Sequence, residues 1–250
     1  MRARLSSWMA AAAVVAAACA PPQSAAPPRN TLVVGIDVSG SFRQAHYDDA
    51  ISFAAYYLYG HLNGSGGLTV PTAVFVGSIG GEVPGEVKSF HPISDFEGKS
   101  VEQIETDLKS WFPPEDRLTD FNAFFSRIAT LVKRRNLILA PLNIVVLSDG
   151  VPDESPNPRD TAGAYAALNV SGLEYLSRSV TVRLLYPTPT VAVDWERHLP
   201  RNRVRVWTVD GQVMAGWHEQ VKPDSVPADQ RALWDWIKEN VDFRVRGKIL

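Results

Sequence analysis

The sequence predicts an α/β domain in which a doubly wound, mostly parallel sheet carries helices on both faces, as in Rossmann-like folds. Three observations predict this fold class. Apolar runs rich in β-branched residues alternate with segments of helical periodicity, a pattern typical of parallel strands joined by crossover helices. Polar residues directly follow two of the runs. No repeat or further linker interrupts residues 31–250, so we expect them to form one domain.

Buried strands explain the apolar runs. A strand that helices cover on both faces is apolar along its whole length instead of alternating between apolar and polar residues. The runs of this kind are Thr31–Ile36, Thr72–Val76, Leu142–Leu147 and Val180–Tyr186. They predict the central part of the sheet.

Two other segments predict strands at the edges of the sheet. Glu86–His91 follows a glycine-rich turn and is expected to pair antiparallel with the strand before it. Arg203–Val209 alternates polar with apolar residues, as a half-exposed strand does. We therefore expect one antiparallel edge strand, and a second, half-exposed strand nearer the edge of the sheet than the apolar runs.

Apolar side chains spaced three or four residues apart predict the helices. One helix follows the first strand, and its inward face holds Tyr47, Ile51, Ala54 and Leu58. A second presents Phe121, Phe124, Phe125, Ile128, Leu131 and Val132. A last helix is expected after Pro227, because proline suits a first helical turn, with Leu233, Trp236, Ile237 and Val241 turned inward.

The first 30 residues predict export and a membrane tether. Arg2 and Arg4 precede an alanine-rich apolar run that ends at small residues before Cys19, which indicates a signal peptide over residues 1–18. The run is shorter than the roughly 20 residues that span a bilayer. The position of Cys19 resembles the lipobox of bacterial lipoproteins, and that resemblance implies a diacylated Cys19. Residues 19–30 are rich in Pro and Ala, and an extended tether of this length reaches about 30 Å.

The residue after the cysteine bears on localisation. Ala20 stands where lipoproteins of the inner membrane often have Asp, so the resemblance favours the bacterial outer membrane, with the domain facing the periplasm. A plain secretory signal with an incidental cysteine is the alternative. A single cysteine excludes an internal disulfide and multi-cysteine metal sites. A net charge of -2 argues against a nucleic-acid partner.

Oxygen-bearing side chains follow two of the buried strands. Asp37, Ser39 and Ser41 come directly after the first run, and Asp149 follows the third. The carboxyl ends of parallel strands meet at one edge, where α/β sheets bind ligands. Hydroxyls with few carboxylates favour Mg²⁺, with Mn²⁺ or Ca²⁺ as alternatives. Thr119 opens the phenylalanine-rich helix, where it is either a further ligand or the N-cap.

Together these residues resemble the metal-ion-dependent adhesion site of von Willebrand factor type A (vWA) domains. Asp37-Val-Ser-Gly-Ser41, Thr119 and Asp149 match the D-x-S-x-S, T and D elements in order, and the resemblance covers nearly all of residues 31–250. It implies that Ser39, Ser41 and Thr119 are hydroxyl ligands and that Asp37 and Asp149 hold the metal directly or through water. Members of this family bind partners at this site and do not transform them.

The resemblance therefore implies a binding module rather than an enzyme. Three neutral hydroxyls and two carboxylates leave a divalent cation incompletely neutralised, so a partner protein is expected to supply an Asp or Glu carboxylate as the sixth ligand.

Two alternatives stay open. Asp37 could be the nucleophile of a metal-dependent phosphatase or hydrolase similar to the haloacid dehalogenases, although Ser39 stands where those enzymes have a second acid. The chain could also be a structural envelope scaffold with an inactive metal site.

Overall fold

The main sheet of this computed structural model has the strand order β4-β2-β1-β6-β7-β8. The structure describes residues 30–153, 161–177 and 179–243. The strands are β1 Thr31–Ile36, β2 Ala73–Ser78, β4 His91–Pro92, β6 Leu142–Leu147, β7 Val180–Leu185 and β8 Val204–Val209. Two short strands, β3 Gly80–Gly81 and β5 Leu118–Thr119, pair separately. All pairs in the main sheet are parallel except β2 with β4, which confirms the predicted fold class.

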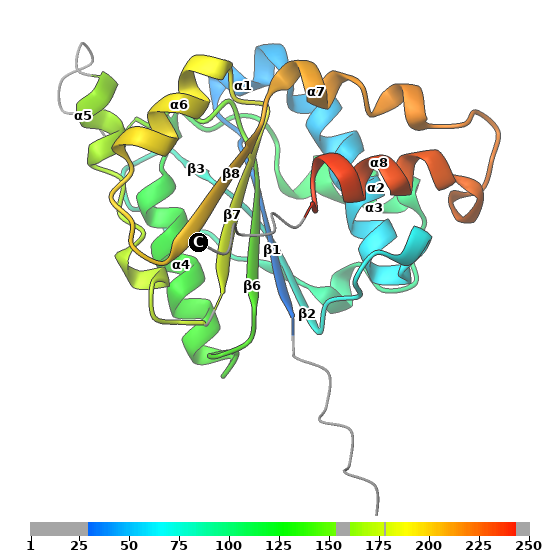
Figure 1. Cartoon of the computed structure of the whole chain (residues 1–250), viewed down its shortest axis with the longest axis horizontal. Coiled ribbons are helices and arrows are strands. Elements are labelled where there is room, and N and C mark those ends of the chain that lie inside the picture. The colour runs from blue at the N-terminus through cyan, green and yellow to red at the C-terminus, as the bar shows by residue number, and fades with distance from the viewer. Residues whose placement is uncertain (1–29, 154–160, 178, 244–250) are drawn as a thin grey trace, which may run out of the picture.

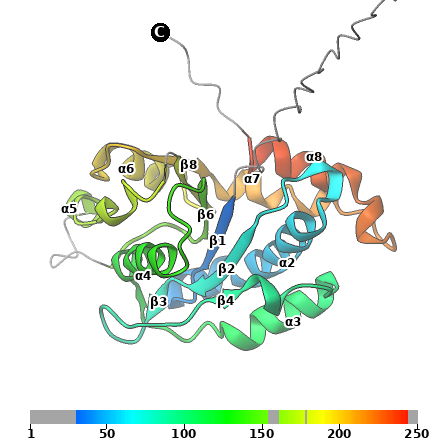
Figure 2. The same ribbon diagram turned by 90° about the horizontal axis from the view of Figure 1, so that it is seen from below.

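Helices cover both faces of the sheet (Figures 1 and 2). They are α1 Gly40–Ala45, α2 Tyr47–Asn63, α3 Val101–Trp111, α4 Phe121–Arg134, α5 Thr161–Ala166, α6 Pro189–His198, α7 Gly211–Ala215 and α8 Arg231–Asn240. One core lies between the sheet and α2, α3, α7 and α8, and the other lies between the sheet and α4, α5 and α6. Within the described residues, no helix is long and apolar enough to cross a membrane.

The register brings the ends of the parallel strands to one level. Ile36 lies beside Leu147, Leu147 beside Leu185, and Leu185 beside Val209. The polar residues that follow β1 and β6 therefore emerge next to each other, as the sequence predicted. We call this side of the molecule the carboxyl edge of the sheet.

The edge strands were predicted with mixed success. β8 lies at one edge and is partly exposed along its middle, as expected. The antiparallel strand is shorter than the predicted Glu86–His91, because only His91 and Pro92 pair with β2. The ring of Phe90 instead packs over Gly77, and Pro92 has no N–H with which to continue the ladder.

The helix after Pro227 also begins later than expected. Pro227 belongs to a short 3₁₀ turn, and α8 begins at Arg231. Leu233, Ile237 and Val241 are buried as predicted, but Trp236 is half-buried while Trp234 is fully buried. The indole N–H of Trp234 donates to the Pro227 carbonyl at 2.9 Å, which holds the 3₁₀ turn against α8. Helix α3 was not predicted, although Ser100 and Gln103 form a capping box at its start.

A buried polar network joins the end of α8 to α2. The Asp242 carboxylate lies 2.8 Å from His61 Nε2 and accepts a hydrogen bond of 2.8 Å from the Tyr57 hydroxyl. Nearby, Arg183 Nε donates to the Val241 carbonyl at 2.7 Å. Burial acts to raise the pKa of Asp242, but the hydrogen bond and charge of His61, with the charge of Arg183 and the Tyr57 hydrogen bond, outweigh it and lower the pKa.

We expect this network to make stability depend on acid pH. Because the folded-state pKa of Asp242 is lowered, its contribution is present above the unfolded value of about 4 and is lost as pH falls through the folded value. Asp242→Asn should therefore lower the free energy of unfolding by about 1–3 kcal/mol at pH 7, and by progressively less below about pH 4. Urea unfolding across this range measures the difference. Asp229→Asn, at an exposed position just before α8, is the control, and a loss for Asp242→Asn that is independent of pH would contradict the expectation.

Candidate metal centre

Asp37 is the first residue after β1, and its carboxylate is held by the protein on both oxygens. Oδ1 accepts the Ser39 amide at 2.9 Å, and Oδ2 accepts the Ser148 hydroxyl at 2.6 Å. The residue is fully buried, with 0% of its surface exposed. The turn at Ser39 and the neighbouring strand β6 therefore fix the direction of this side chain.

The Asp37 carboxylate lacks a cationic partner. Burial raises its pKa to about 6, although the hydrogen bonds from Ser148 and Ser39 act in the opposite direction, and the charge of Asp149 raises it further. Among the described residues, no Lys, Arg or His forms an ion pair with Asp37. A buried carboxylate without a cation is costly. A bound divalent cation would supply the missing charge.

The two serines of the motif lie beside Asp37. Ser39 is buried and occupies the N-cap position of α1, yet its side chain makes no capping hydrogen bond. Its Oγ lies 3.4 Å from Oγ of Ser41, which is exposed. Serine at an N-cap usually bonds to the first-turn amides. Here the Ser39 hydroxyl is turned toward the other hydroxyl of the motif.

Thr119 does not cap α4. It belongs to β5, pairs with Gly80, and is buried. The N-cap is Asp120, whose carboxylate accepts the Ala123 amide at 2.7 Å, so the interpretation of Thr119 as a cap was wrong. Asp120 directly precedes α4 and therefore occupies the N-cap position, whereas Thr119 is paired with Gly80 in the small sheet.

The loop after β6 links Thr119 to the part of the chain that carries Asp149. The Thr119 amide donates to Oδ2 of Asp153 at 2.7 Å, and the Asp153 amide donates back to the Thr119 carbonyl at 3.3 Å. Asp149 is half-buried, and its Oδ1 accepts the Val151 amide at 3.0 Å. Contacts thus connect Asp37, Ser39 and Ser41 directly. Thr119 is connected, through Asp153, only to the loop that carries Asp149. That all five oxygens meet around one cation stays a prediction.

Sequence reasoning missed Ser148 and Asp116. Ser148 lies in the same Ser-Asp-Gly segment as Asp149, and the parallel register of β1 and β6 places it beside Asp37. Asp116 forms a bridge with Ser39, but Lys88 Nζ lies 2.6 Å from its Oδ1. Since this lysine already neutralises it, Asp116 is not a free ligand. Nothing in the local sequence indicated either pairing.

Trp195, on α6, contacts the loop that follows β6 and carries Asp149. Its indole N–H donates to the Gly150 carbonyl at 2.7 Å, and its side chain is fully buried beside Phe121 and Phe125. Gly150 has a φ of 77°, a conformation that favours glycine. The turn that carries Asp149 is therefore held between this indole and the end of β6.

The donor set fits a hard divalent cation. All five predicted ligands offer oxygen, and Mg²⁺ prefers oxygen ligands while keeping some of its waters. In the described part of the chain, no group of three or more His, Cys, Asp and Glu side chains is placed to hold a metal. A site with two carboxylates depends instead on hydroxyls and water. The residues present therefore fit Mg²⁺ better than Zn²⁺, which favours nitrogen and sulfur.

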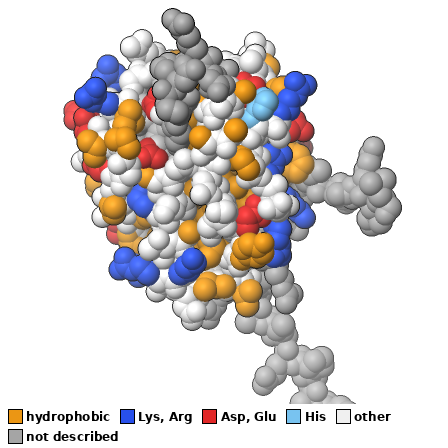
Figure 3. Space-filling view, turned by 90° about the vertical axis from the view of Figure 1, so that its left-hand side faces the viewer, with side chains coloured by type: hydrophobic (Ala, Val, Ile, Leu, Met, Phe, Trp, Pro, Cys, Tyr) orange, Lys and Arg blue, Asp and Glu red, His pale blue; other side chains and the backbone are white. Residues whose placement is uncertain are grey.

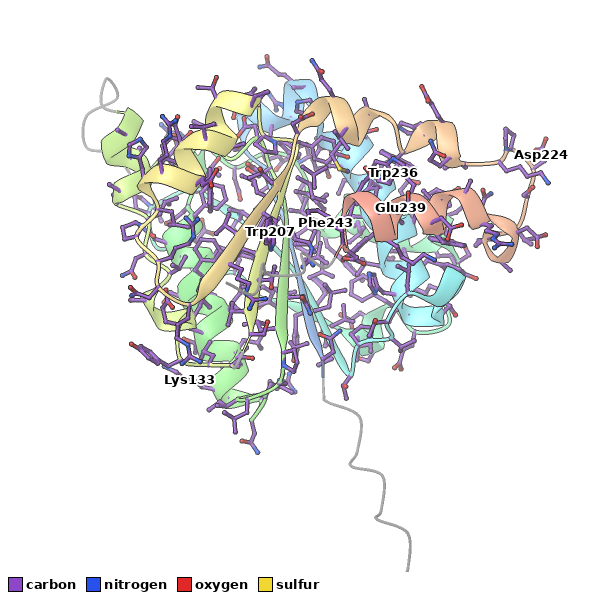
Figure 4. The ribbon with its side chains drawn as sticks, in the orientation of Figure 1. Lys133, Trp207, Asp224, Trp236, Glu239 and Phe243 are labelled. Atoms are coloured by element: carbon purple, nitrogen blue, oxygen red, sulfur yellow. The ribbon has the colours of Figure 1, made fainter. Side chains whose placement is uncertain are left out.

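A cavity in the described structure lies away from this site. It has a volume of about 430 Å³ and is lined by residues at the starts of β1, β6 and β7, with Trp207 and Phe243 at one side. Figure 4 labels these two aromatic side chains near the middle of the molecule. The cavity is thus separate from the carboxyl edge and from the candidate metal centre.

Comparisons with known proteins return similarities of fold only. No protein-family model matches the chain, and no curated protein sequence matches it. Similar solved structures include human COPII-coat protein Sec24c (TM-score 0.45, 10% identity, covering 86% of this chain and 32% of that one). They also include the pilus adhesin SpaC from Lactobacillus rhamnosus GG (TM-score 0.45, 13% identity, covering 87% of this chain and 31% of that one). A third is the SpRpn10 VWA domain (TM-score 0.43, 10% identity, covering 81% of this chain and 93% of that one).

The chain spans about a third of the length of the Sec24c and SpaC chains. At these identities and TM-scores, the likenesses carry no argument about function.

Proposed function

We propose that this chain is a membrane-tethered vWA-like domain that binds a protein partner through a Mg²⁺-centred adhesion site. Asp37, Ser39, Ser41, Thr119 and Asp149 would hold the ion, with Mn²⁺ or Ca²⁺ as alternative metals. The observation that carries the proposal is the buried Asp37 carboxylate, which the protein orients by two hydrogen bonds but does not neutralise. When bound, the ion supplies positive charge and an exchangeable coordination position.

The residues around the proposed ion have distinct roles. Ser148 and the Ser39 amide orient Asp37, while Lys88 neutralises the neighbouring Asp116. The exposed Ser41 lies at the solvent side. An Asp or Glu from the partner would approach there, because a carboxylate offers both charge and the preferred oxygen donor.

The geometry does not favour the phosphatase alternative. A phosphoryl-accepting aspartate must meet a bulky phosphate ester directly, whereas Asp37 is fully buried. A metal ion is much smaller and can be held by such a carboxylate directly or through water. Ser39, where such enzymes have their second acid, has no acidic function. A binding role agrees better with these contacts.

Asn30, where the proposed tether would join the domain, and the proposed site lie at opposite edges of the sheet. The predicted signal peptide, Cys19 and the tether up to residue 29 are outside the described residues. Asn30 precedes β1 and therefore lies at the edge where the parallel strands begin. A lipid anchor at Cys19, on the periplasmic side of the bacterial outer membrane, would leave the metal centre facing away from that membrane.

Partner binding should require both the ion and the exposed serine. Affinity capture from envelope extract with the full chain as bait should retain a specific protein in Mg²⁺ and release it on chelation. Ser41→Ala should reduce the captured amount at least about tenfold, as expected when one ligand oxygen is lost. Ser94→Ala, at an exposed serine after β4, is the matched control.

A competition step identifies the chemistry of the partner. A short peptide with one glutamate should displace the captured protein, and its glutamine analogue should not. Capture that survives chelation, or that is equal for Ser41→Ala and the parent, would contradict an ion-centred adhesion site.

A further inference from the structure

We propose that the edge of the sheet opposite the candidate metal centre is a membrane-contact surface that binds a bilayer containing anionic phospholipids. We call it the basic edge. It consists of the segments that lead into β2, β6, β7 and β8, namely residues 69–72, 133–141, 171–177 and 200–203. Because these strands are parallel, all four segments lie at the same end of the sheet.

The charge of the basic edge is almost entirely positive. Its basic residues are Lys133, Arg134, Arg135, Arg201 and Arg203. Within these four segments the one acidic residue is Glu174, which is only 3% exposed and accepts hydrogen bonds from the amides of Asn202 and Arg203. None of the five basic side chains forms an ion pair with a carboxylate of the described residues. Arg201 is half-buried, and its Nη1 donates to the carbonyls of Trp195 and Glu196. The other four side chains are exposed, so their charge is available to an anionic surface.

Exposed apolar side chains lie among these charges. Val70, Ile138, Leu139 and Tyr175 are 55%, 45%, 67% and 78% exposed. The guanidinium of Arg203 lies 5.9 Å from the Tyr175 ring centre. Figure 3 shows basic and hydrophobic side chains side by side at the lower end of the molecule, and Figure 4 places Lys133 at this end. Basic residues mixed with aliphatic and aromatic ones are typical of surfaces that rest on the headgroup region of a bilayer.

The backbone conformation of Leu139 is a second, independent observation in favour of a contact surface here. It has a φ of 74°, a left-handed conformation that is costly for leucine. A hydrogen bond of 2.8 Å from its amide to the Leu176 carbonyl holds this conformation. Since the side chain is largely exposed, the conformation gains no burial within the protein. Contact with the apolar part of a bilayer would bury the Leu139 side chain, which the protein itself leaves exposed.

The position of Asn30 specifies which surface the basic edge would meet. The Thr31 amide donates to the Pro141 carbonyl at 2.9 Å, and the Thr72 amide donates to the Asn30 carbonyl at 2.8 Å. Asn30, the last residue of the proposed tether, therefore lies between two segments of the basic edge. An extended tether of residues 19–30 reaches about 30 Å, so the nearest large surface is the membrane itself. The inference rests on the proposed tether, but not on the metal site.

A single-cysteine probe tests the contact in the full chain. Cys19→Ser removes the only cysteine and with it the proposed acylation site, so contact with the vesicle then depends on the basic edge and not on the lipid anchor. Leu139→Cys carries an environment-sensitive fluorophore. Vesicles consist of phosphatidylcholine alone or with about one third phosphatidylglycerol, and both contain a lipid-attached quencher. Val213→Cys, at a 39% exposed position on α7 at the carboxyl edge, is the matched probe. Co-sedimentation reports separately whether the leader holds the chain on the vesicle.

Quenching at position 139 should be at least about threefold stronger with the anionic lipid than without it, and high salt should abolish the difference. Position 213 should show no such difference. Lys133→Glu with Arg134→Glu should remove the effect, while Lys222→Glu with Arg231→Glu, two exposed basic residues near α8, should retain it. Circular dichroism checks that each variant is folded, and Asp37→Ala should leave the quenching unchanged.

Equal quenching at position 139 in both vesicle types would overturn the proposal, whether or not the chain sediments with them. So would equal responses at positions 139 and 213, or a response that survives the double charge reversal. Loss of partner capture in Ser41→Ala with normal quenching at position 139 would separate the two proposals.

Discussion

Asp37→Asn is expected to abolish stabilisation by Mg²⁺ while leaving the metal-free protein folded. Asparagine can still accept the Ser39 amide through its carbonyl oxygen, and its amide group can donate to the Ser148 hydroxyl. The variant no longer buries a carboxylate without a cation, so the metal-free form should be at least as stable as the parent. What it loses is the charge that attracts the ion.

The size of the effect follows from ligand linkage. At a Mg²⁺ concentration 100 times its dissociation constant, the parent should gain about 2.7 kcal/mol in its free energy of unfolding. For a chain of this length, that gain corresponds to a rise of about 5–10 °C in Tm. Thermal unfolding in Mg²⁺ and in chelator measures it for parent and variant.

Asp224→Asn provides the control for this measurement. Asp224 is exposed at the outer end of the molecule beyond α8, to the side of the strands (Figure 4), and has a φ of 56°, which asparagine tolerates well. It should show the full response of the parent. An Asp37→Asn variant that gains as much from Mg²⁺ as the parent would end the case for a metal at this position.

Trp195→Ala should produce the largest loss of stability of any substitution considered for this protein. The side chain is fully buried among α4, α6 and the sheet, and replacing a buried tryptophan by alanine typically costs about 3–5 kcal/mol. Chemical denaturation would report this as a lower midpoint with an unchanged slope.

Trp195→Phe separates packing from the support of the metal loop. Phenylalanine keeps an aromatic ring in the core but leaves the Gly150 carbonyl without its indole donor, which costs about 1–3 kcal/mol for a buried group. Because Gly150 follows Asp149, Mg²⁺ affinity should also fall.

The matched control is Trp217→Phe, another fully buried tryptophan, whose indole donates to Asp49. It should lose stability while its Mg²⁺ affinity stays unchanged. If Mg²⁺ affinity in Trp195→Phe equals that of the parent, the indole has no role in positioning the loop.

Most of the fold could be predicted from local pattern. The four buried strands lie within two residues of their predicted bounds, because a strand covered on both faces needs a continuous apolar run. Helix α4 follows from the spacing of its phenylalanines, which are buried as expected. Helix α3 was missed because it is short, with three buried residues among polar ones. The antiparallel edge was misplaced because Phe90 packs on a glycine far from it in sequence.

Some features of the candidate site could likewise be predicted from the sequence, and others could not. The D-x-S-x-S segment and Asp149 are visible in the sequence, since chemistry at the ends of parallel strands needs particular residue types at particular places. Their partners are not visible. Ser148 lies 111 residues from Asp37, and Lys88 lies 28 residues from Asp116. Thr119 and Asp120 are neighbours, and only the packing of β5 against β3 determined which of them caps the helix.

Local residue order thus established the strands, the main helices and the oxygen ligands, because hydrophobic period and side-chain chemistry are properties of a short segment. Folding in three dimensions established which carboxylate is left without a cation, which one Lys88 neutralises, and that four separated loops form one basic edge. Those outcomes depend on which strands become neighbours and in what register. Such pairings are selected by the burial of the whole core, so no single segment encodes them.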